Sequence, residues 1–289
     1  MKRALVLGLG LAGLAATPAR ADENYFGYSY GSETVPKGGT EAYLWATDRR
    51  GKGQGKYSAQ DYRLELEHGF TDRFQVSGYL NFESHDVRGL EPGFEDVKRG
   101  LGFKGVQTAF KYAVLSPYKD GIGLAFYVEP GWSRINSLTG ERGTEYELEL
   151  KAILQKNFLD DRLIWVGNLT FEPEWEKEVE IDAVSGAREV EWKKEAVLEA
   201  STGLAYRVAS NWMLGVEGRY TSIYPDWTKQ FDRETYAVSA GPAIHYAGRK
   251  WWFTATYLPQ LFGRPSPIGS RALDEYEKRE LRLKVGYNF

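Results

Sequence analysis

The sequence predicts an all-β protein, a closed up-and-down antiparallel transmembrane β-barrel of twelve strands. Three observations carry this prediction. Apolar and polar residues alternate along many stretches, so each stretch has one apolar and one polar face. The connections between stretches are alternately long and short, and aromatic residues lie near the stretch ends. A transmembrane barrel combines these features because its strands face lipid on one side and a polar interior on the other.

The composition fits a barrel and excludes several other classes. A chain of 289 residues has room for one large β domain. Its net charge of -3 implies no nucleic-acid partner. A mean hydropathy of -0.48 is typical of soluble proteins, but a barrel reaches such values because half of each strand faces a polar interior. The absence of cysteine excludes disulfides, thiolate metal sites and cysteine nucleophiles.

Residues 1–21 are predicted to be a cleaved signal peptide. Residues 1–3 start the chain with two basic side chains, residues 4–16 form a short apolar run, and residues 19–21 fit a cleavage site with small residues. Three glycines within residues 8–13 also match a dinucleotide-binding fingerprint, but a proline and the cleavage site follow where that fingerprint needs a helix. We therefore predict export and no bound cofactor.

The mature chain is predicted to begin at Asp22. Residues 22–38 are polar and rich in Gly and Tyr, and they are predicted to form a periplasmic lead-in. The sequence leaves open whether they fold into the barrel mouth. Residues 39–289 are predicted to form the barrel, and none of their apolar runs approaches the ~20 residues of a membrane helix. The predicted strands are 39–48, 57–69, 73–84, 101–115, 121–134, 143–157, 162–177, 188–207, 211–223, 233–247, 250–261 and 275–289.

The connections between these strands predict how the barrel is oriented. The odd connections are long and polar, whereas the even ones are tight turns, and the two kinds alternate. Outer-membrane barrels have long extracellular loops and short periplasmic turns. Both chain termini are therefore predicted to lie on the periplasmic side, as an even number of strands requires.

The last strand shows most clearly which faces the strands present. Its apolar positions alternate from Leu281 to Phe289, and the positions between them include Arg282 and Lys284. Other strands place aromatic residues of the apolar face near their ends, as the two aromatic belts of a lipid-facing surface require. These aromatic residues are Phe74, Trp165, Trp212 and Trp251 at turn ends and Trp132, Trp175 and Tyr220 at loop ends.

Three segments resemble a family of uncharacterised Gram-negative outer-membrane β-barrel proteins. They are the Gly-Ser-Glu-Thr-Val-Pro-Lys-Gly lead-in at 31–38, the glycine-rich loop at 51–55 and the turn at 67–73. The strand ending in Phe289 is similar to the terminal strands that the barrel-assembly machinery recognises. The resemblance implies a barrel in the outer membrane, in contact with its lipids and assembled through the Phe289 strand. It implies no catalytic or binding residues.

The polar faces predict a lumen that carries more acids than bases. On the interior faces sixteen acidic residues stand against seven basic ones, a surplus larger than the net charge of the chain. Unpaired buried charges are costly, so part of the set is expected to pair across strands. The candidate residues for selectivity are Arg63, Glu65, Glu147, Glu149, Lys151, Glu172, Glu174, Glu195, Glu199, Glu217, Arg219, Arg282 and Lys284.

The histidines give little support for catalysis or for a metal site. A barrel lipase would need a His beside a Ser, but Ser239 lies about 20 Å along the same strand from His245 at ~3.3 Å per residue. A serine on a neighbouring strand is not excluded by the sequence. No pair of histidines has metal-ligand spacing. We therefore predict that the chain is not an enzyme and binds no metal.

The function predicted from these features is a narrow, porin-like channel that passes small polar solutes with a mild preference for cations. Twelve strands lie between the eight of filled barrels and the sixteen of open porins, so the bore should be narrow. The first alternative is a barrel that transports nothing and acts through its extracellular loops in surface binding or as a structural protein. A barrel lipase is a third reading.

Overall fold

The structure is a computed structural model that describes residues 24–289, except 54, 91–95, 138, 182–187 and 266–268. The predicted signal peptide, residues 1–21, lies outside the described residues. The described residues include no helix that is long and apolar enough to cross a membrane.

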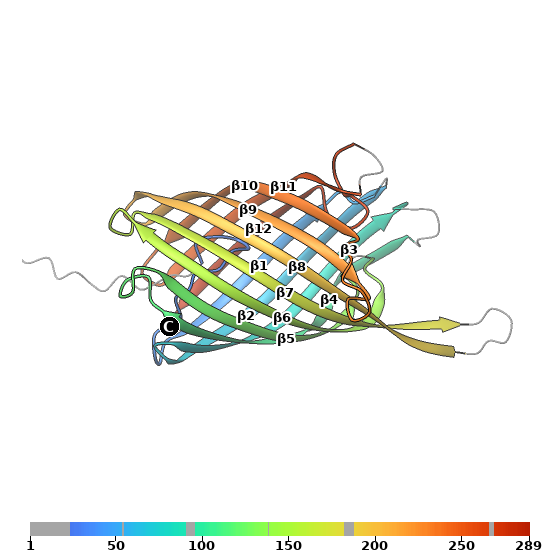
Figure 1. Cartoon of the computed structure of the whole chain (residues 1–289), viewed down its shortest axis with the longest axis horizontal. Helices are drawn as coiled ribbons and strands as arrows, with labels where there is room; N and C mark the ends of the chain where they lie inside the picture. The colour runs from blue at the N-terminus through green and yellow to red at the C-terminus, as the bar shows by residue number, and fades with distance from the viewer. Residues whose placement is uncertain (1–23, 54, 91–95, 138, 182–187, 266–268) are drawn as a thin grey trace, which may run out of the picture.

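Within the described residues twelve strands form one closed antiparallel barrel, as the sequence predicts (Figure 1). Each strand pairs with its neighbours in the chain, and β1 closes the barrel by pairing with β12, where Leu44 lies opposite Val285. The strands are β1 (Thr40–Arg50), β2 (Lys56–Thr71), β3 (Phe74–Arg88), β4 (Val97–Leu115), β5 (Gly123–Ile135), β6 (Arg142–Phe158), β7 (Leu163–Ile181), β8 (Arg188–Ala209), β9 (Trp212–Pro225), β10 (Thr235–Ala247), β11 (Trp251–Arg264) and β12 (Arg279–Asn288).

The two ends of the barrel differ. The C-terminus and the connections such as 72–73 and 210–211 lie at one end, here called the turn end. The connections 51–55, 136–141 and 265–278 lie at the other, the loop end. The predicted contrast in length is weaker in places, since 136–141 is shorter than the turn-end connection 116–122. β7 and β8 instead continue past the barrel wall as a hairpin at the loop end (Figure 1).

The outer face of the barrel is apolar, as the alternation predicts. Leu66, Leu169 and Val216 are each more than half exposed, which only an apolar surrounding would accommodate on this scale. Aromatic rings contact one another near both ends of this face. The ring of Trp251 packs against that of Tyr287 at the turn end, with centroids 4.7 Å apart. Phe103 packs against Phe82 and Trp132 toward the loop end.

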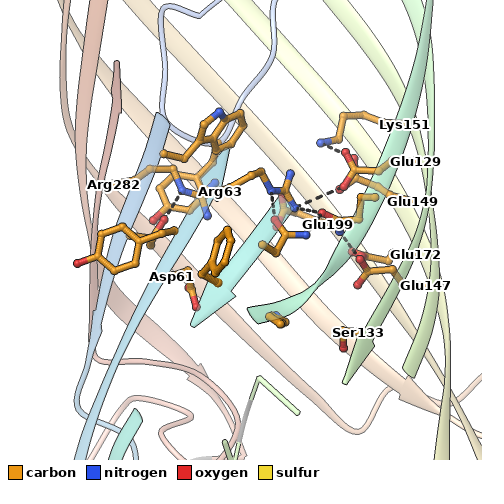
Figure 2. A pocket seen from close by; sticks show the side chains of 18 of the residues that line it. Asp61, Arg63, Glu129, Ser133, Glu147, Glu149, Lys151, Glu172, Glu199 and Arg282 are labelled. Atoms are coloured by element: carbon orange, nitrogen blue, oxygen red, sulfur yellow. Dashed lines mark hydrogen bonds and ion pairs between the residues drawn. The ribbon is translucent and has the colours of Figure 1, made fainter. Parts of the chain in front are cut away.

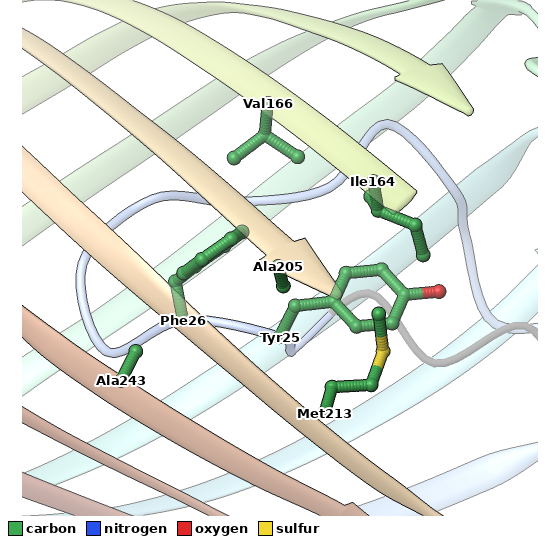
Figure 3. Packing of buried hydrophobic residues seen from close by; sticks show 7 residues of the cluster. All are labelled: Tyr25, Phe26, Ile164, Val166, Ala205, Met213 and Ala243. Atoms are coloured by element: carbon green, nitrogen blue, oxygen red, sulfur yellow. The ribbon is translucent and has the colours of Figure 1, made fainter. Parts of the chain in front are cut away.

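Residues 24–38 are here called the plug segment, and residues 24–35 of this segment lie inside the barrel. The segment makes a turn within the lumen (Figure 3) and returns to the turn end, where the Lys37 amide donates to Asp72 and the Gly38 amide donates to the Gly69 carbonyl. Phe26 is fully buried, and with Tyr25 it packs on wall residues that include Ile164, Val166 and Met213. Gly203 makes room for this ring, because a Cβ there would lie 2.6 Å from it. Part of the predicted periplasmic lead-in thus occupies the lumen.

Candidate functional site

One carboxylate of the wall holds the tip of the plug segment. Glu217 on β9 is almost fully buried. Its Oε1 accepts hydrogen bonds from the backbone amides of Tyr28 at 2.9 Å and Ser29 at 2.5 Å, and its Oε2 accepts one from Gly27 at 3.1 Å. Three donors around one carboxylate offset the cost of burying its charge. The contact therefore fixes where the plug segment turns.

Side chains of several strands satisfy the rest of the plug backbone. Asn168 on β7 accepts a hydrogen bond from the amide of Tyr30 at 2.6 Å and donates one to its carbonyl at 3.0 Å. Gln155 on β6 accepts from the amide of Ser32 at 2.8 Å, and Gln75 on β3 accepts from that of Val35 at 2.7 Å. A buried backbone needs such partners where no strand pairs with it. The plug segment is therefore built into the wall and does not simply fill space.

Tyrosine rings of the plug segment lie against basic side chains of the wall. Two guanidinium groups lie against the ring of Tyr28, with Arg282 at 3.9 Å and Arg219 at 4.5 Å from its centroid. The Lys151 ammonium lies 4.2 Å from the ring of Tyr30. Desolvated cation–π contacts of this kind are attractive. The plug segment thus engages several of the basic residues of the lumen.

On the loop-end side of this layer the lumen contains two cavities. A cavity of about 270 Å³ lies next to Tyr28 and Tyr30, and a second cavity of about 430 Å³ lies nearer the loop end. Glu147 and Glu172 line both cavities, so we treat the two as one chamber. Figure 2 shows Arg63 and Arg282 on one side of the chamber and a set of glutamates on the other.

The glutamates form an acidic wall on β5 to β8. Glu149 lies opposite Glu129 on the neighbouring strand, and Glu174 lies opposite both Glu147 and Glu195. Like charges directly opposite one another destabilise a sheet. Some are compensated: Lys151 lies 2.9 Å from Glu149, Arg63 lies 3.5 Å from Glu129, and Gln107 donates a hydrogen bond to Glu147. No ion pair of Glu172 or Glu174 occurs among the described residues.

The structure places the thirteen candidate residues in the lumen but divides them into three groups. The first group lines the cavity beside the plug segment: Arg63, Glu147, Glu149, Lys151, Glu172, Glu199, Arg219 and Arg282. Glu174 and Glu195 form the second group and line the cavity nearer the loop end. Glu65, Glu217 and Lys284 are buried beneath the first cavity, where Glu65 accepts a hydrogen bond from Trp45 at 2.8 Å.

Sequence reasoning missed a charged cluster at the loop end that is centred on Arg49. Its guanidinium contacts Asp61 at 2.7 Å, Glu277 at 2.9 Å and Glu83. It also donates to the Tyr57 hydroxyl at 2.9 Å and to the Ser137 carbonyl at 3.0 Å. The alternation could have identified Arg49 as interior, but the predicted first strand ended at residue 48.

The cluster ties three connections together over the lumen. Arg49 bonds to connection 136–141 through Ser137 and to connection 265–278 through Glu277, and Lys52 of connection 51–55 lies 3.5 Å from Glu277. Burial alone would raise the pKa of Glu277, but the charges of Lys52 and Arg49 outweigh it and hold the pKa at about 2. Burial lowers the pKa of Lys52, and Glu277 opposes that effect. We call this network the loop latch.

Lys104 is a second interior base that sequence reasoning missed. Asn81 pairs with Gly105 and Phe82 pairs with Phe103, which leaves Lys104 in a bulge. A bulge breaks the alternation of faces, so parity alone misplaces the side chain. Lys104 lies 3.5 Å from Glu83 and lines the chamber. Lys104 and Arg49 thus add to the bases that line the chamber, and Glu275 and Glu277 add to its acids.

The three histidines occupy different structural settings. His68 contacts the Thr40 hydroxyl at 2.8 Å, and His85 lies 3.3 Å from Glu83. His245 contacts the Thr254 hydroxyl at 2.7 Å and packs edge-on against Tyr25 beneath the plug segment. On the neighbouring strands the residues opposite His245 are Met213 and Thr254, neither a serine. Within the described parts of the chain no group of three acidic, His or Cys side chains could hold a metal ion.

Comparison with known proteins gives a family and a fold. A model of a family of unknown function (DUF6662) matches residues 18–289. No curated protein matches the chain. An outer-membrane channel of the COG4313 group from Pseudomonas putida F1 shares 17% identity at a TM-score of 0.62, over 89% of this chain and 98% of that one.

Two autotransporter domains are also similar in structure. The β domain of the Bordetella autotransporter BrkA shares 13% identity at a TM-score of 0.53, over 87% of this chain and 99% of that one. The translocator domain of NalP from Neisseria meningitidis shares 12% identity at a TM-score of 0.52, over 87% and 88%. At these identities the likeness shows the fold alone, and that fold is the outer-membrane barrel.

Proposed function

We propose a channel function for this chain, which belongs to the family of unknown function DUF6662. It resides in the outer membrane of a Gram-negative bacterium, reached through a cleaved signal peptide. It passes small polar solutes with a mild preference for cations. The loop end faces outward and the turn end faces the periplasm, as in barrels whose termini are periplasmic.

The acidic wall of the chamber is the observation that carries this proposal. Glu147, Glu172 and Glu174 line the chamber and have few basic partners. Arg219 and Arg282, in contrast, lie against the Tyr28 ring of the plug segment. A narrow passage with low-dielectric walls focuses the field of such charges. The mobile solute on this wall is therefore expected to be positive.

The plug segment sets the resting state of the proposed channel. It crosses the lumen between the chamber and the turn end, and its backbone is bonded to β3, β6, β7 and β9. The loop latch narrows the other end. We infer that wild-type protein conducts weakly and that conduction increases when the plug segment leaves the wall.

Reversal potential in a planar bilayer tests the selectivity. Across a salt gradient at low ionic strength the purified protein should favour cations, and the preference should fade as the Debye length falls from ~30 Å at 0.01 M to ~3 Å at 1 M. Replacing Glu147, Glu149, Glu172 and Glu174 together with Gln should move the reversal potential toward zero. Anion preference, or no change in the quadruple variant, would contradict the proposed selectivity.

A complete lack of conductance would favour the alternative of a barrel that works through its loops. To separate that outcome from a closed channel, the same measurement is made on a variant with a weakened plug anchor, Glu217→Gln. If neither the wild-type protein nor this variant conducts, the channel proposal is overturned. We propose no enzymatic activity, since His245 bonds to Thr254 and is buried beneath the plug segment, away from any lipid substrate.

A further inference from the structure

The loop end holds a further cavity, between β4 and β5, that is separate from the chamber. The two strands pair only as far as Gly105 and Ser133, although β4 continues to Val97 and β5 to Ile135. A cavity of about 250 Å³ lies where they part. Its lining is Arg99, Gly102, Phe103, Arg134, Ile135 and Arg142.

The three arginines come from three successive strands and bring no counter-charge with them. Among the described residues, Arg99, Arg134 and Arg142 have no carboxylate within ion-pair distance. Neighbouring like charges repel, so such a group is stabilised by an anion. Guanidinium groups suit phosphate in particular, because their fork of donors matches its oxygens.

Apolar surface of the outer face adjoins the cavity that the arginines line. Phe103 lines the cavity, and its ring contacts Phe82 at 5.9 Å and Trp132 at 6.4 Å between centroids. Leu101 on the same strand is 62% exposed. A free phosphate would use the arginines alone, whereas an amphiphile would use both surfaces. The combination of three cations above an aromatic girdle matches a phosphorylated lipid whose chains lie along the barrel.

We propose that this cavity binds the phosphate of an outer-leaflet lipid, with the acyl chains packed beside Phe103 and Leu101. Arg99, Arg134 and Arg142 contact the phosphate oxygens. The inference uses the proposed orientation of the barrel but not its channel activity, so a silent channel would leave it intact. The lipid would also bridge β4 and β5 where they are not paired to each other.

The test is lipid retention by the full mature protein, measured by native mass spectrometry after reconstitution with lipid A, the phosphorylated glycolipid of outer leaflets. The test variant replaces Arg99, Arg134 and Arg142 with Gln. The control variant removes the same charge at the turn end, through Arg73→Gln, Arg162→Gln and Arg249→Gln. Wild type and control should retain one lipid, and the test variant should bind it about tenfold more weakly or worse.

Two further arms identify the source of the phosphate. Dephosphorylated lipid A should be retained no better by wild type than by the test variant. Inorganic phosphate should displace lipid A only at concentrations far above that of the lipid. Equal retention of lipid A by the test and control variants would overturn the site. Displacement of lipid A by inorganic phosphate at equal concentration would overturn the proposal of a lipid ligand and would identify the cavity as a site for free anions.

Discussion

Glu217 and Tyr28 are 189 positions apart in the sequence, yet the Glu217 carboxylate accepts the backbone amide hydrogen bond of Tyr28 at 2.9 Å. The same carboxylate bonds to the amides of Gly27 and Ser29. This side chain of β9 therefore holds the plug segment at its turn, together with Thr256 of β11, which also accepts from the Gly27 amide at 3.0 Å. Each such bond to a buried charge contributes roughly 1.5–3 kcal/mol, so the anchor is strong enough to hold the segment in place.

Replacing Glu217 with Gln should release the tip of the plug segment. The amide keeps the size of the side chain but loses the charge, and its NH2 group would face backbone donors. Since the chain has no cysteine, Ser29→Cys supplies a single thiol at a buried position of the plug segment. Thiol labelling should become at least about tenfold faster in the Glu217→Gln background, a change that corresponds to about 1.4 kcal/mol.

The matched control is Glu199→Gln, also in the lumen. Glu199 lines the chamber but makes its contacts to Arg219 and Thr221, not to the plug backbone. Labelling of Ser29→Cys should stay close to wild type in this background. Equal acceleration by the two variants would show that any lost lumen charge loosens the segment, and would remove the special role of Glu217.

Gly203 should be the position at which a small addition displaces Phe26. A Cβ at residue 203 would lie 2.6–2.7 Å from three carbons of the Phe26 ring, so Gly203→Ala forces the ring to move. Phe26→Ala removes the ring and leaves a cavity that costs about 3–5 kcal/mol. Both variants should raise single-channel conductance in a planar bilayer. Gly78→Ala serves as the control, because nothing lies within 4 Å of a Cβ there.

Strand number and strand faces could be predicted because they depend on local alternation. Leu281 to Phe289 shows this, since each residue's face follows from its parity. Arg49 was missed because the predicted strand stopped too early, and Lys104 because a bulge reverses parity. The path of the plug segment had no local signal. Its partners Gln75, Asn168 and Glu217 lie on separate strands, and only the closed barrel brings them together.

The contacts of Glu277 within the loop latch should be insensitive to pH across the physiological range. The pKa of Glu277 is held at about 2, below the ~4.3 of an unperturbed glutamate, so its ionised form is favoured in the folded state. The stabilisation is complete above the unperturbed pKa and is lost as pH falls toward 2. The Glu277 contacts with Arg49 and Lys52 should therefore persist between pH 5 and 8, and Glu277→Gln should raise conductance at neutral pH. The ratio of the Glu277→Gln conductance to the wild-type conductance should stay constant across this range, and a ratio that changes near pH 6 would contradict this assignment.

Substitution of a lipid-facing residue of β6 should impair insertion, whereas substitution of its lumen-facing neighbour should alter conduction. Leu150 is exposed on the outer face, whereas the adjacent Glu149 lines the chamber. Leu150→Gln brings a polar group into hydrocarbon and should reduce the yield of folded protein on insertion into lipid vesicles. Glu149→Gln should insert as wild type does and alter only conduction. Equal insertion of both variants would contradict the assignment of the two faces.

Phe289 should matter for assembly more than for the stability of the finished barrel. In the folded protein it is 66% exposed, contacts the ring of Tyr287 at 5.1 Å between centroids, and donates its amide to the Thr40 carbonyl at 3.1 Å. Removing the ring keeps that amide bond, so Phe289→Ala should change the stability of refolded protein little. If the barrel-assembly machinery recognises this terminal aromatic, the yield in the outer membrane should fall several-fold.

The two quantities are measured on the same variants, by unfolding of the refolded protein in detergent and by the amount of protein in isolated outer membranes. Trp251→Ala is the control, since Trp251 is 60% exposed and belongs to the same aromatic cluster through Tyr287 but lies inside the chain. It should affect the two quantities together, because it carries no terminal signal. Unchanged membrane yield of Phe289→Ala would show that the last residue is not the one recognised. A parallel loss of stability and yield would assign Phe289 a purely structural role in the belt at the turn end.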